Sequence, residues 1–196
     1  MKFAIVIFLI LFTVTVLFAN GNYLDKLSEE IDKQYPQAII IRQSFYSDKV
    51  KKYDKPPEFV TDDFDCNGMK DTALQIYHEG KIKLIIIYRF KGKETKIVEM
   101  GASGEMPLDS IQGHYEDYIT LKKKGKRVEF YCDCGKENTG NEDQELCRKY
   151  ADRKSERGYG LKLDCDAIEG IFDGRAAKLY YFDKKTNKYL SVITAD

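Results

Sequence analysis

Four aspartates lie close together in one short segment of this sequence, DDFDCNGMKD, which runs from Asp62 to Asp71. Carboxylates at such spacing repel one another, so the grouping is unfavourable unless a cation lies among them. Ca²⁺ prefers about six to eight hard oxygen ligands, and a tight loop can supply them from alternate residues. Read from Asp63, the segment fits D-x-D-x-N-G-x-x-D. It predicts one calcium site whose ligands are the side chains of Asp63, Asp65, Asn67 and Asp71 and the backbone carbonyl of Met69.

The residues between the ligands support a loop, and they also leave an alternative open. Gly68 permits a sharp turn, and Phe64 is expected to point inward and tie the loop to the core. The alternative is an Asx-rich turn without a metal, because Asp, Asn and Gly are the residues that turns use. An EF-hand is excluded, because Leu74 stands where that loop needs a bidentate Glu and strand-type residues follow.

The stretch FVTDDFDCNGMKDTALQI, residues 59–76, resembles the calcium loop of FG-GAP or VCBS-type repeats. In those repeats a strand enters, D-x-D-x-D/N-G-x-x-D binds the ion, and a strand leaves. The chain has one copy of this motif, at residues 62–72, and is too short for a propeller. It is therefore more similar to small exported bacterial proteins that carry a single such motif. The ending DAIEGIFDGRAAKLYYFDKKTNKYLSVITAD, residues 166–196, strengthens the likeness. The resemblance implies the ligand set above but no biological task. Cys66 departs from the pattern and would place a thiol beside the ion.

The N-terminus has the features of an export signal. Lys2 precedes an apolar run from Phe3 to Phe18, and small residues follow at Ala19 and Gly21. This order is typical of a cleaved signal peptide. The rival interpretation, a membrane anchor, needs about 20 apolar residues to cross a bilayer. We therefore expect residues 1–21 to be removed and residues 22–196 to form one secreted or periplasmic domain without a membrane span.

Five cysteines are present, and disulfides are their usual state in an exported protein. We expect Cys132 and Cys134 to pair with Cys147 and Cys165 in an order that the sequence does not give. Cys66 is then left free. A zinc site is the alternative for those four cysteines, but a C-x-C spacing without a nearby His fits its usual ligand gaps poorly.

The remaining pattern predicts an α+β domain, in which a curved antiparallel sheet of hairpins packs against one N-terminal amphipathic helix. Apolar residues at helical spacing place that helix between Asn22 and Tyr35, and a short second helix is expected over Glu142–Tyr150. Helices and strands do not alternate, which disfavours a parallel sheet. Asp48–Pro57 and Gly101–Tyr115 are expected to be loops. Runs of alternating or β-branched residues predict strands at Ala38–Tyr46, Ala73–His78, Lys83–Phe90, Thr95–Met100, Tyr118–Lys122, Arg127–Tyr131, Ala177–Phe182 and Tyr189–Thr194. Those at 118–122 and 127–131 are expected to form one hairpin.

The charges and histidines narrow the functional classes. With 32 basic and 32 acidic residues, the chain gives no electrostatic reason to expect nucleic acid or anionic lipid as a partner. The basic run Lys122–Arg127 fits a solvated hairpin tip. His78 and His114 belong to no spaced catalytic or metal motif. We therefore expect a calcium-binding module with an unknown envelope or extracellular partner. A small secreted hydrolase or inhibitor with an unrecognised cleft is the alternative.

Overall fold

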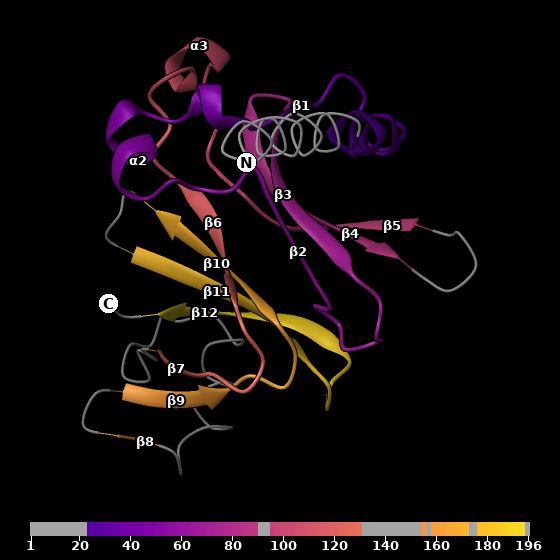
Figure 1. Cartoon of the computed structure of the whole chain (residues 1–196), viewed down its shortest axis with the longest axis vertical. Coiled ribbons are helices and arrows are strands. Elements are labelled where there is room, and N and C mark those ends of the chain that lie inside the picture. The colour runs from indigo at the N-terminus through magenta and orange to yellow at the C-terminus, as the bar shows by residue number, and fades with distance from the viewer. Residues whose placement is uncertain (1–22, 90–94, 131–153, 156–157, 173–175, 195–196) are drawn as a thin grey trace, which may run out of the picture. The chain divides into compact units, whose positions relative to one another are not determined.

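The structure is a computed structural model of the whole chain (Figure 1). It describes residues 23–89, 95–130, 154–155, 158–172 and 176–194. The chain divides into two compact units, residues 1–40 and residues 41–196. The expected signal peptide and the expected helix at residues 142–150 lie outside the described residues. Within the described ranges, no helix is both long and apolar enough to cross a membrane.

The described part of the first unit begins with a helix at residues 23–32. Leu24, Leu27 and Ile31 are buried, at the three- and four-residue steps that define one face of a helix. The N–H of Tyr35 still donates to the carbonyl of Ile31 at 2.8 Å, and Pro36 follows. A helix start at Asn22 lies outside the described residues, and the packing of this helix on a sheet stays a prediction.

The strand expected over Ala38–Tyr46 is wrong for most of its length. Within this range only Ile39–Ile40 forms a strand, β1, and the 3-10 helix η1, Gln43–Phe45, follows in the second unit. The N–H of Phe45 donates to the carbonyl of Arg42 at 2.9 Å. This local bond replaces a strand ladder, because β-branched composition describes a packing environment rather than a fixed backbone preference.

Two short helices occupy segments that were expected to be loops. The first is α2, Asp48–Tyr53, whose N-cap hydroxyl on Ser47 accepts from the N–H of Val50. The second is α3, Leu108–Ile111. Val50 and Ile111 are buried in one apolar cluster, so tertiary packing stabilises turns that the local sequence signals only weakly.

The first sheet of residues 41–196 is an antiparallel meander of β2, Phe59–Asp62, β3, Asp71–His78, β4, Lys81–Arg89, and β5, Thr95–Ala102. The three expected strands that correspond to β3, β4 and β5 are confirmed, except that Phe90 lies outside the described residues. Glu79 and Gly80, which join β3 to β4, have φ values of 51° and 75°. Positive φ at both positions matches the right-handed twist of a two-residue hairpin turn.

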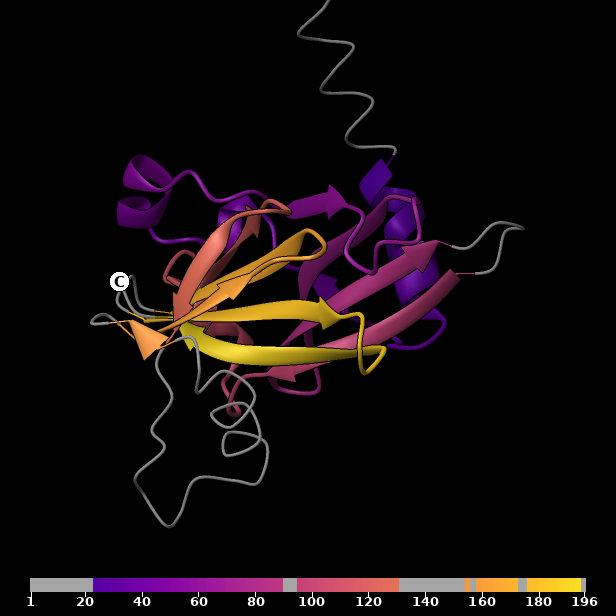
Figure 2. The same cartoon turned by 90° about the horizontal axis from the view of Figure 1, so that it is seen from below.

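The second sheet has the strand order β6-β10-β11-β12-β7-β9-β8 and curves strongly (Figure 2). Its antiparallel pairs bear out the expected curved, mostly antiparallel sheet. The C-terminal hairpin is confirmed as β11 and β12. The bounds of the strands are β6 Tyr118–Lys122, β7 Arg127–Phe130, β8 Lys154–Ser155, β9 Gly158–Lys162, β10 Ala167–Phe172, β11 Ala176–Asp183 and β12 Lys188–Thr194.

The expected hairpin of β6 with β7 is wrong, although both strands exist. β6 pairs with β10, and β7 pairs with β9 and β12. The turn between them bonds to a distant residue, because the N–H of Gly125 donates to the carbonyl of Leu163 at 2.9 Å. The N–H of Leu163 in turn donates to the carbonyl of Lys126 at 3.0 Å. Residues about forty positions away therefore take the place of the neighbouring strand.

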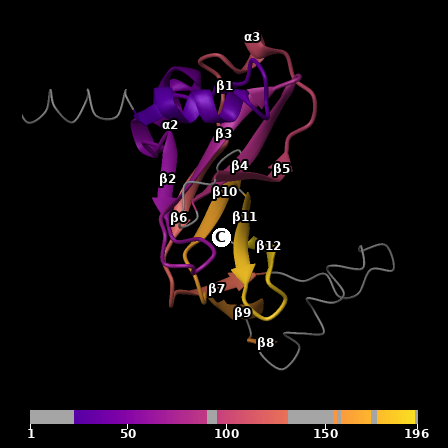
Figure 3. The same cartoon turned by 90° about the vertical axis from the view of Figure 1, so that its right-hand side faces the viewer.

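The two sheets share an apolar core. Side chains from β2, β3 and β4 meet side chains from β6, β10 and β11 in one buried cluster: Val60, Phe64, Ala73, Leu84, Ile86, Tyr88, Ile119, Ile168 and Tyr180. Phe64 comes from the loop between β2 and β3 and is completely buried. The acidic loop is therefore anchored where the two sheets meet, and its position beside the end of β6 is visible in Figure 3.

Candidate metal centre

The acidic loop is the connection between β2 and β3. Asp62 ends β2, Asp71 begins β3, and the two residues are paired across the ladder. The loop turns through two residues in the left-handed region, Cys66 with φ 59° and Gly68 with φ 84°. A closed ladder at its base and a buried Phe64 fix the ends of the loop, so the side chains between them are gathered into a small volume.

Three carboxylates meet inside this loop. Asp63, Asp65 and Asp71 each offer one oxygen, and these oxygens lie within 4.8 Å of one another. Asp71 is fully buried, whereas Asp63 and Asp65 are partly exposed. Among the described residues, no ion pair involves any of the three. The three acidic residues predicted as ligands are thus brought together without a protein cation to neutralise them.

Backbone N–H groups orient the carboxylates. Asp71 accepts from the N–H of Phe64 and from the N–H of Arg89, each at 3.2 Å. Asp63 Oδ2 accepts from the N–H of Gly68 at 3.0 Å. Asp63 Oδ1 is buried and has no hydrogen-bond partner within the described ranges of the chain. Since buried polar atoms are almost always paired, this oxygen marks a place where a partner is missing.

Of the other two predicted ligands, Asn67 is exposed and Met69 is partly exposed. The N–H and Nδ2 of Asn67 donate to the two oxygens of Asp65 at 3.1 and 2.9 Å. Asn67 Oδ1 accepts from the N–H of Met69 at 2.7 Å. These are the bonds of an Asx turn, the metal-free alternative for this segment. The amide oxygen of Asn67 would have to leave Met69 or be shared with it in order to reach an ion.

The electrostatics of the site follow from burial and mutual repulsion. Burial raises the pKa of Asp71 to about 7, the N–H groups of Arg89 and Phe64 oppose the rise, and the charges of Asp65 and Asp63 add to it. The pKa of Asp65 is also raised, chiefly by burial, against the opposing hydrogen bond from the N–H of Asn67. The ionised forms of these carboxyl groups are therefore unfavourable in the metal-free protein, and a bound cation would stabilise them.

Two tyrosines lie on the core side of the loop. The rings of Tyr88 on β4 and Tyr189 on β12 are 5.7 Å apart. Both phenol oxygens are buried, and neither meets the geometry of a hydrogen bond. Burial raises the pKa of each phenol, and the charges of Asp65 and Asp71 raise it further. The sequence did not predict this pair of tyrosines beside the loop, because Tyr189 is far from the motif along the chain.

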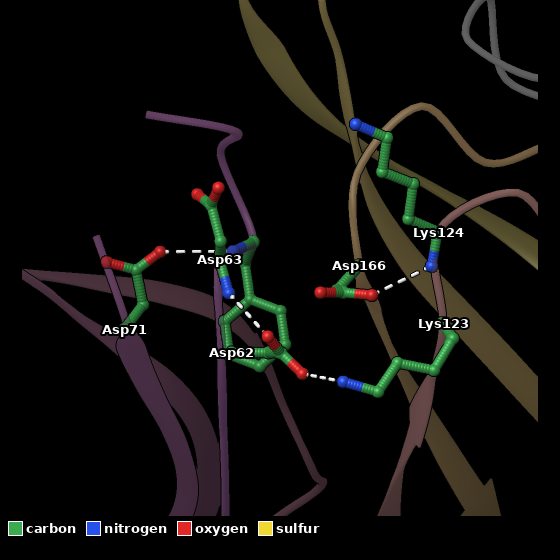
Figure 4. Close-up of polar contacts among 7 residues, drawn as sticks. Asp62, Asp63, Asp71, Lys123, Lys124 and Asp166 are labelled. Carbon is green, nitrogen blue, oxygen red and sulfur yellow. Dashed lines mark hydrogen bonds and ion pairs between the residues drawn. The ribbon is translucent and has the colours of Figure 1, made fainter. Parts of the chain in front are cut away.

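A second polar network ties the loop to the other sheet (Figure 4). The ammonium group of Lys123 donates to Asp62 Oδ2. The backbone N–H of Lys124 donates to Asp166 Oδ1 at 2.7 Å. Burial raises the pKa of Asp62, but hydrogen bonds with Lys123, Asp166 and the N–H of Asp63 outweigh it and leave the pKa below its usual range. For Asp166, burial and the neighbouring Asp62 raise the pKa. The basic run interpreted as a solvated hairpin tip thus supplies one cation to the base of the loop.

The cysteine assignment needs a correction, because Cys66 is not free. A disulfide joins Cys66 to Cys165, whose Cα atoms are 5.4 Å apart. Pairing by proximity along the chain failed because the loop after β2 lies against the segment before β10, although 99 residues separate the two cysteines. The expected thiol beside the ion is therefore absent. Cys132, Cys134 and Cys147 lie outside the described residues.

The histidines contribute nothing to the loop. His78 ends β3, where its Nδ1 lies 3.5 Å from a carboxylate oxygen of Glu79. His114 is exposed after α3.

The chain was compared with known protein families, curated protein sequences and solved structures. None of them matches it. The geometry of the acidic loop is therefore the basis on which a function can be argued.

Proposed function

We propose that the loop from Asp63 to Asp71 binds one calcium ion, and that the ion serves as a structural staple in an exported protein. The observation that carries this proposal is the convergence of three carboxylates within 4.8 Å without a paired cation in the described structure. The unpartnered, buried Oδ1 of Asp63 supports it. The ligand set is Asp63, Asp65, Asn67, Asp71 and the carbonyl of Met69, as in a single FG-GAP or VCBS-like motif.

Calcium is favoured over other metals by the donors. The set contains only carboxylate, amide and carbonyl oxygens, and hard, flexible oxygen sites suit Ca²⁺. Mg²⁺ demands a stricter octahedral geometry at shorter distances, which a half-exposed loop with an Asx turn does not impose. Soft metals prefer thiolates, and Cys66, the one cysteine in the loop sequence, is held in a disulfide.

A staple role agrees with the surroundings of the loop. Phe64 enters the shared core, Cys66 is bonded to Cys165, and Asp62 is paired with Lys123. Each of these contacts links the first sheet to the second. An ion that fixes the loop would therefore reduce separation of the sheets, and the disulfide suits a secreted or periplasmic location.

Asp63→Asn is the sharpest test of this proposal. The variant keeps an oxygen for the N–H of Gly68 and places its amide at the position of the unpartnered Oδ1, so the loop retains its hydrogen bond while losing one charge. We expect its metal-free melting temperature to be unchanged or raised, and its stabilisation by millimolar Ca²⁺ to be lost. Differential scanning calorimetry with Ca²⁺, Mg²⁺ and EGTA measures both effects.

Asp109→Asn is the matched control, because Asp109 is an exposed aspartate on α3 away from the loop. This variant should keep the full response to calcium. If the unmodified protein melts at the same temperature in EGTA and in excess Ca²⁺, and calorimetric titration gives no binding heat, the proposal is wrong and the loop is an Asx turn.

A further inference from the structure

A cavity of about 460 Å³ lies in the second sheet, at the turn that joins β6 to β7. Pockets for small molecules usually measure about 300–1,000 Å³ and occur at the mouths of curled sheets. β6, β10, β11, β12 and β7 are successive neighbours in this sheet, and β9 and β8 continue it beyond β7. The short turn after β6 leads directly to β7. The cavity lies at the mouth that this curvature creates.

The floor of the cavity combines apolar side chains with the hydroxyl of Thr194 and the buried carboxylate of Glu169. Ile171, Ala177 and Thr194 are cross-strand neighbours on β10, β11 and β12, and all three line the cavity. Thr194 is only 6% exposed, and its buried Oγ1 has no hydrogen-bond partner among the residues that the structure describes. A buried hydroxyl that lines a cavity and has no protein partner requires a ligand or an ordered water to complete its hydrogen bonding.

The rim of the cavity carries an excess of positive charge. Lys122 is neutralised by the buried Glu169 at 2.8 Å, and Lys123 is paired with Asp62. Lys126 and Arg127 are exposed, and neither forms an ion pair within the described part of the chain. One further acid, Glu129, lines the wall. Two unpaired cations against one carboxylate favour an anionic ligand.

The guanidinium of Arg127 lies across the backbone of β9. A methyl group built on Gly160 would come within 2.4 Å of its Nε and 2.5 Å of its Nη2. The absence of a side chain at residue 160 therefore gives the guanidinium its place. Arg is the side chain best suited to bind a carboxylate through two parallel hydrogen bonds.

From these observations we propose that the cavity binds a small molecule with a carboxylate group and an apolar body. The carboxylate lies at Arg127 and Lys126, the apolar body covers Ile171 and Ala177, and a polar atom of the ligand meets the hydroxyl of Thr194. This site shares no proposed ligand residue with the calcium loop, although Lys123 on its rim pairs with Asp62 at the base of that loop.

Benzoate is the probe that tests both halves of the ligand. Benzamide has the same ring without the charge, acetate has the charge without the ring, and inorganic phosphate is a second anion. We expect benzoate to bind the purified protein saturably in nitrogen-15 NMR titrations, with shifts at the amides of Lys126, Arg127 and Thr194. It should bind at least about tenfold more tightly than benzamide, the factor expected for a charge-assisted hydrogen bond. It should also bind at least about tenfold more tightly than acetate, which lacks the apolar ring.

Variants separate the cavity from general surface charge. Lys126→Gln should weaken benzoate binding several-fold. Lys185→Gln, which removes an exposed lysine between β11 and β12, should not. Thr194→Val should weaken the binding of 4-hydroxybenzoate, whose phenol can meet the Thr194 hydroxyl, more than it weakens the binding of benzoate. Gly160→Ala should displace the guanidinium of Arg127 and weaken binding while the melting temperature stays near its original value. Equal affinity for benzamide, tighter binding of phosphate than of benzoate, or no saturable shift at these amides would overturn the proposal.

Discussion

Asp71 is the residue at which protein stability and metal binding compete. It is the most buried of the three clustered carboxylates, and its only described hydrogen bonds come from the backbone N–H groups of Phe64 and Arg89. With a pKa of about 7, the carboxyl is partly protonated at neutral pH. A proton and a calcium ion therefore compete for the same oxygens, because metal ligands must be deprotonated.

Metal-free stability and calcium affinity change with pH in opposite directions. The folded pKa of Asp71 lies above the value of about 4 expected in the unfolded chain, so the folded state binds the extra proton between about pH 4 and pH 7. The contribution of Asp71 to metal-free stability is therefore largest at the acid end of this window and declines as pH rises to about 7. Calcium affinity changes in the opposite direction, falling by up to about tenfold per unit below pH 7.

Two measurements check this pH dependence. Chemical unfolding in EGTA from pH 4.5 to 8 gives the metal-free profile, and calorimetric titration with Ca²⁺ over the same range gives the affinity. Asp71→Asn serves as the reference, because its amide does not titrate and its stability profile should lack the decline. An affinity that is constant between pH 5.5 and 7.5 would contradict the role assigned to Asp71.

For the loop as an element, backbone shape matters as much as ligand identity. Gly68 has φ 84°, and a methyl group built on it meets no atom within 4 Å. Substitution of Gly68 by Ala therefore tests backbone conformation without any packing clash. We expect Gly68→Ala to lower the free energy of unfolding by about 1 kcal/mol, the cost of a left-handed conformation for a residue with a Cβ.

Gly104 provides the matched control for Gly68. A methyl group on Gly104 also meets nothing within 4 Å, and its φ lies outside the left-handed region. Gly104→Ala should change stability by less than about 0.5 kcal/mol. Urea unfolding gives the free energy of unfolding of both variants. Equal losses in the two would show that the left-handed conformation of Gly68 has no particular effect on stability.

Local features of these elements were predictable from sequence, whereas pairings between distant segments were not. The apolar, β-branched runs of β3 and β4 and the turn at Glu79 and Gly80 depend on neighbouring residues, and so does the cluster of Asp63, Asp65 and Asp71. β6 and β7 pair with strands that lie far away along the chain, and the turn between them bonds to the distant Leu163. The turn-forming residues near Gly125 do not encode these pairings. Cavity residues such as Thr194 follow from those pairings and were missed for the same reason.

Within residues 41–196, one junction links the two sheets by three kinds of interaction. Phe64 contributes apolar burial, Cys66 and Cys165 form a covalent bond, and the charge of Lys123 meets Asp62. Phe64 and Cys66 lie in the loop between β2 and β3, and Asp62 ends β2 immediately before it. Because the residues that would bind calcium lie between these anchors, the order of the loop and the cohesion of the sheets are coupled.

The disulfide is therefore expected to affect both the free energy of unfolding and the affinity for calcium. It closes a loop with a sequence separation of 99 residues, and its removal in Cys66→Ala/Cys165→Ala should lower the free energy of unfolding by about 2–4 kcal/mol. The same bond limits the conformations of the residues around Cys66, so a loop without it must become ordered when calcium binds. We expect the double variant to bind Ca²⁺ several-fold more weakly, since pre-organisation reduces the ordering cost of binding.

A double-mutant cycle with Asp63→Asn separates these two effects. If the ion and the disulfide stabilise the same junction, their contributions in saturating Ca²⁺ should differ from additivity by about 0.5–3 kcal/mol. In EGTA the two changes should be additive, because no ion is present to couple them. Additivity under both conditions, with an unchanged calcium affinity in the disulfide-free variant, would show that the loop orders itself without its covalent anchor. The ion would then stabilise the loop alone and not the contact between the sheets.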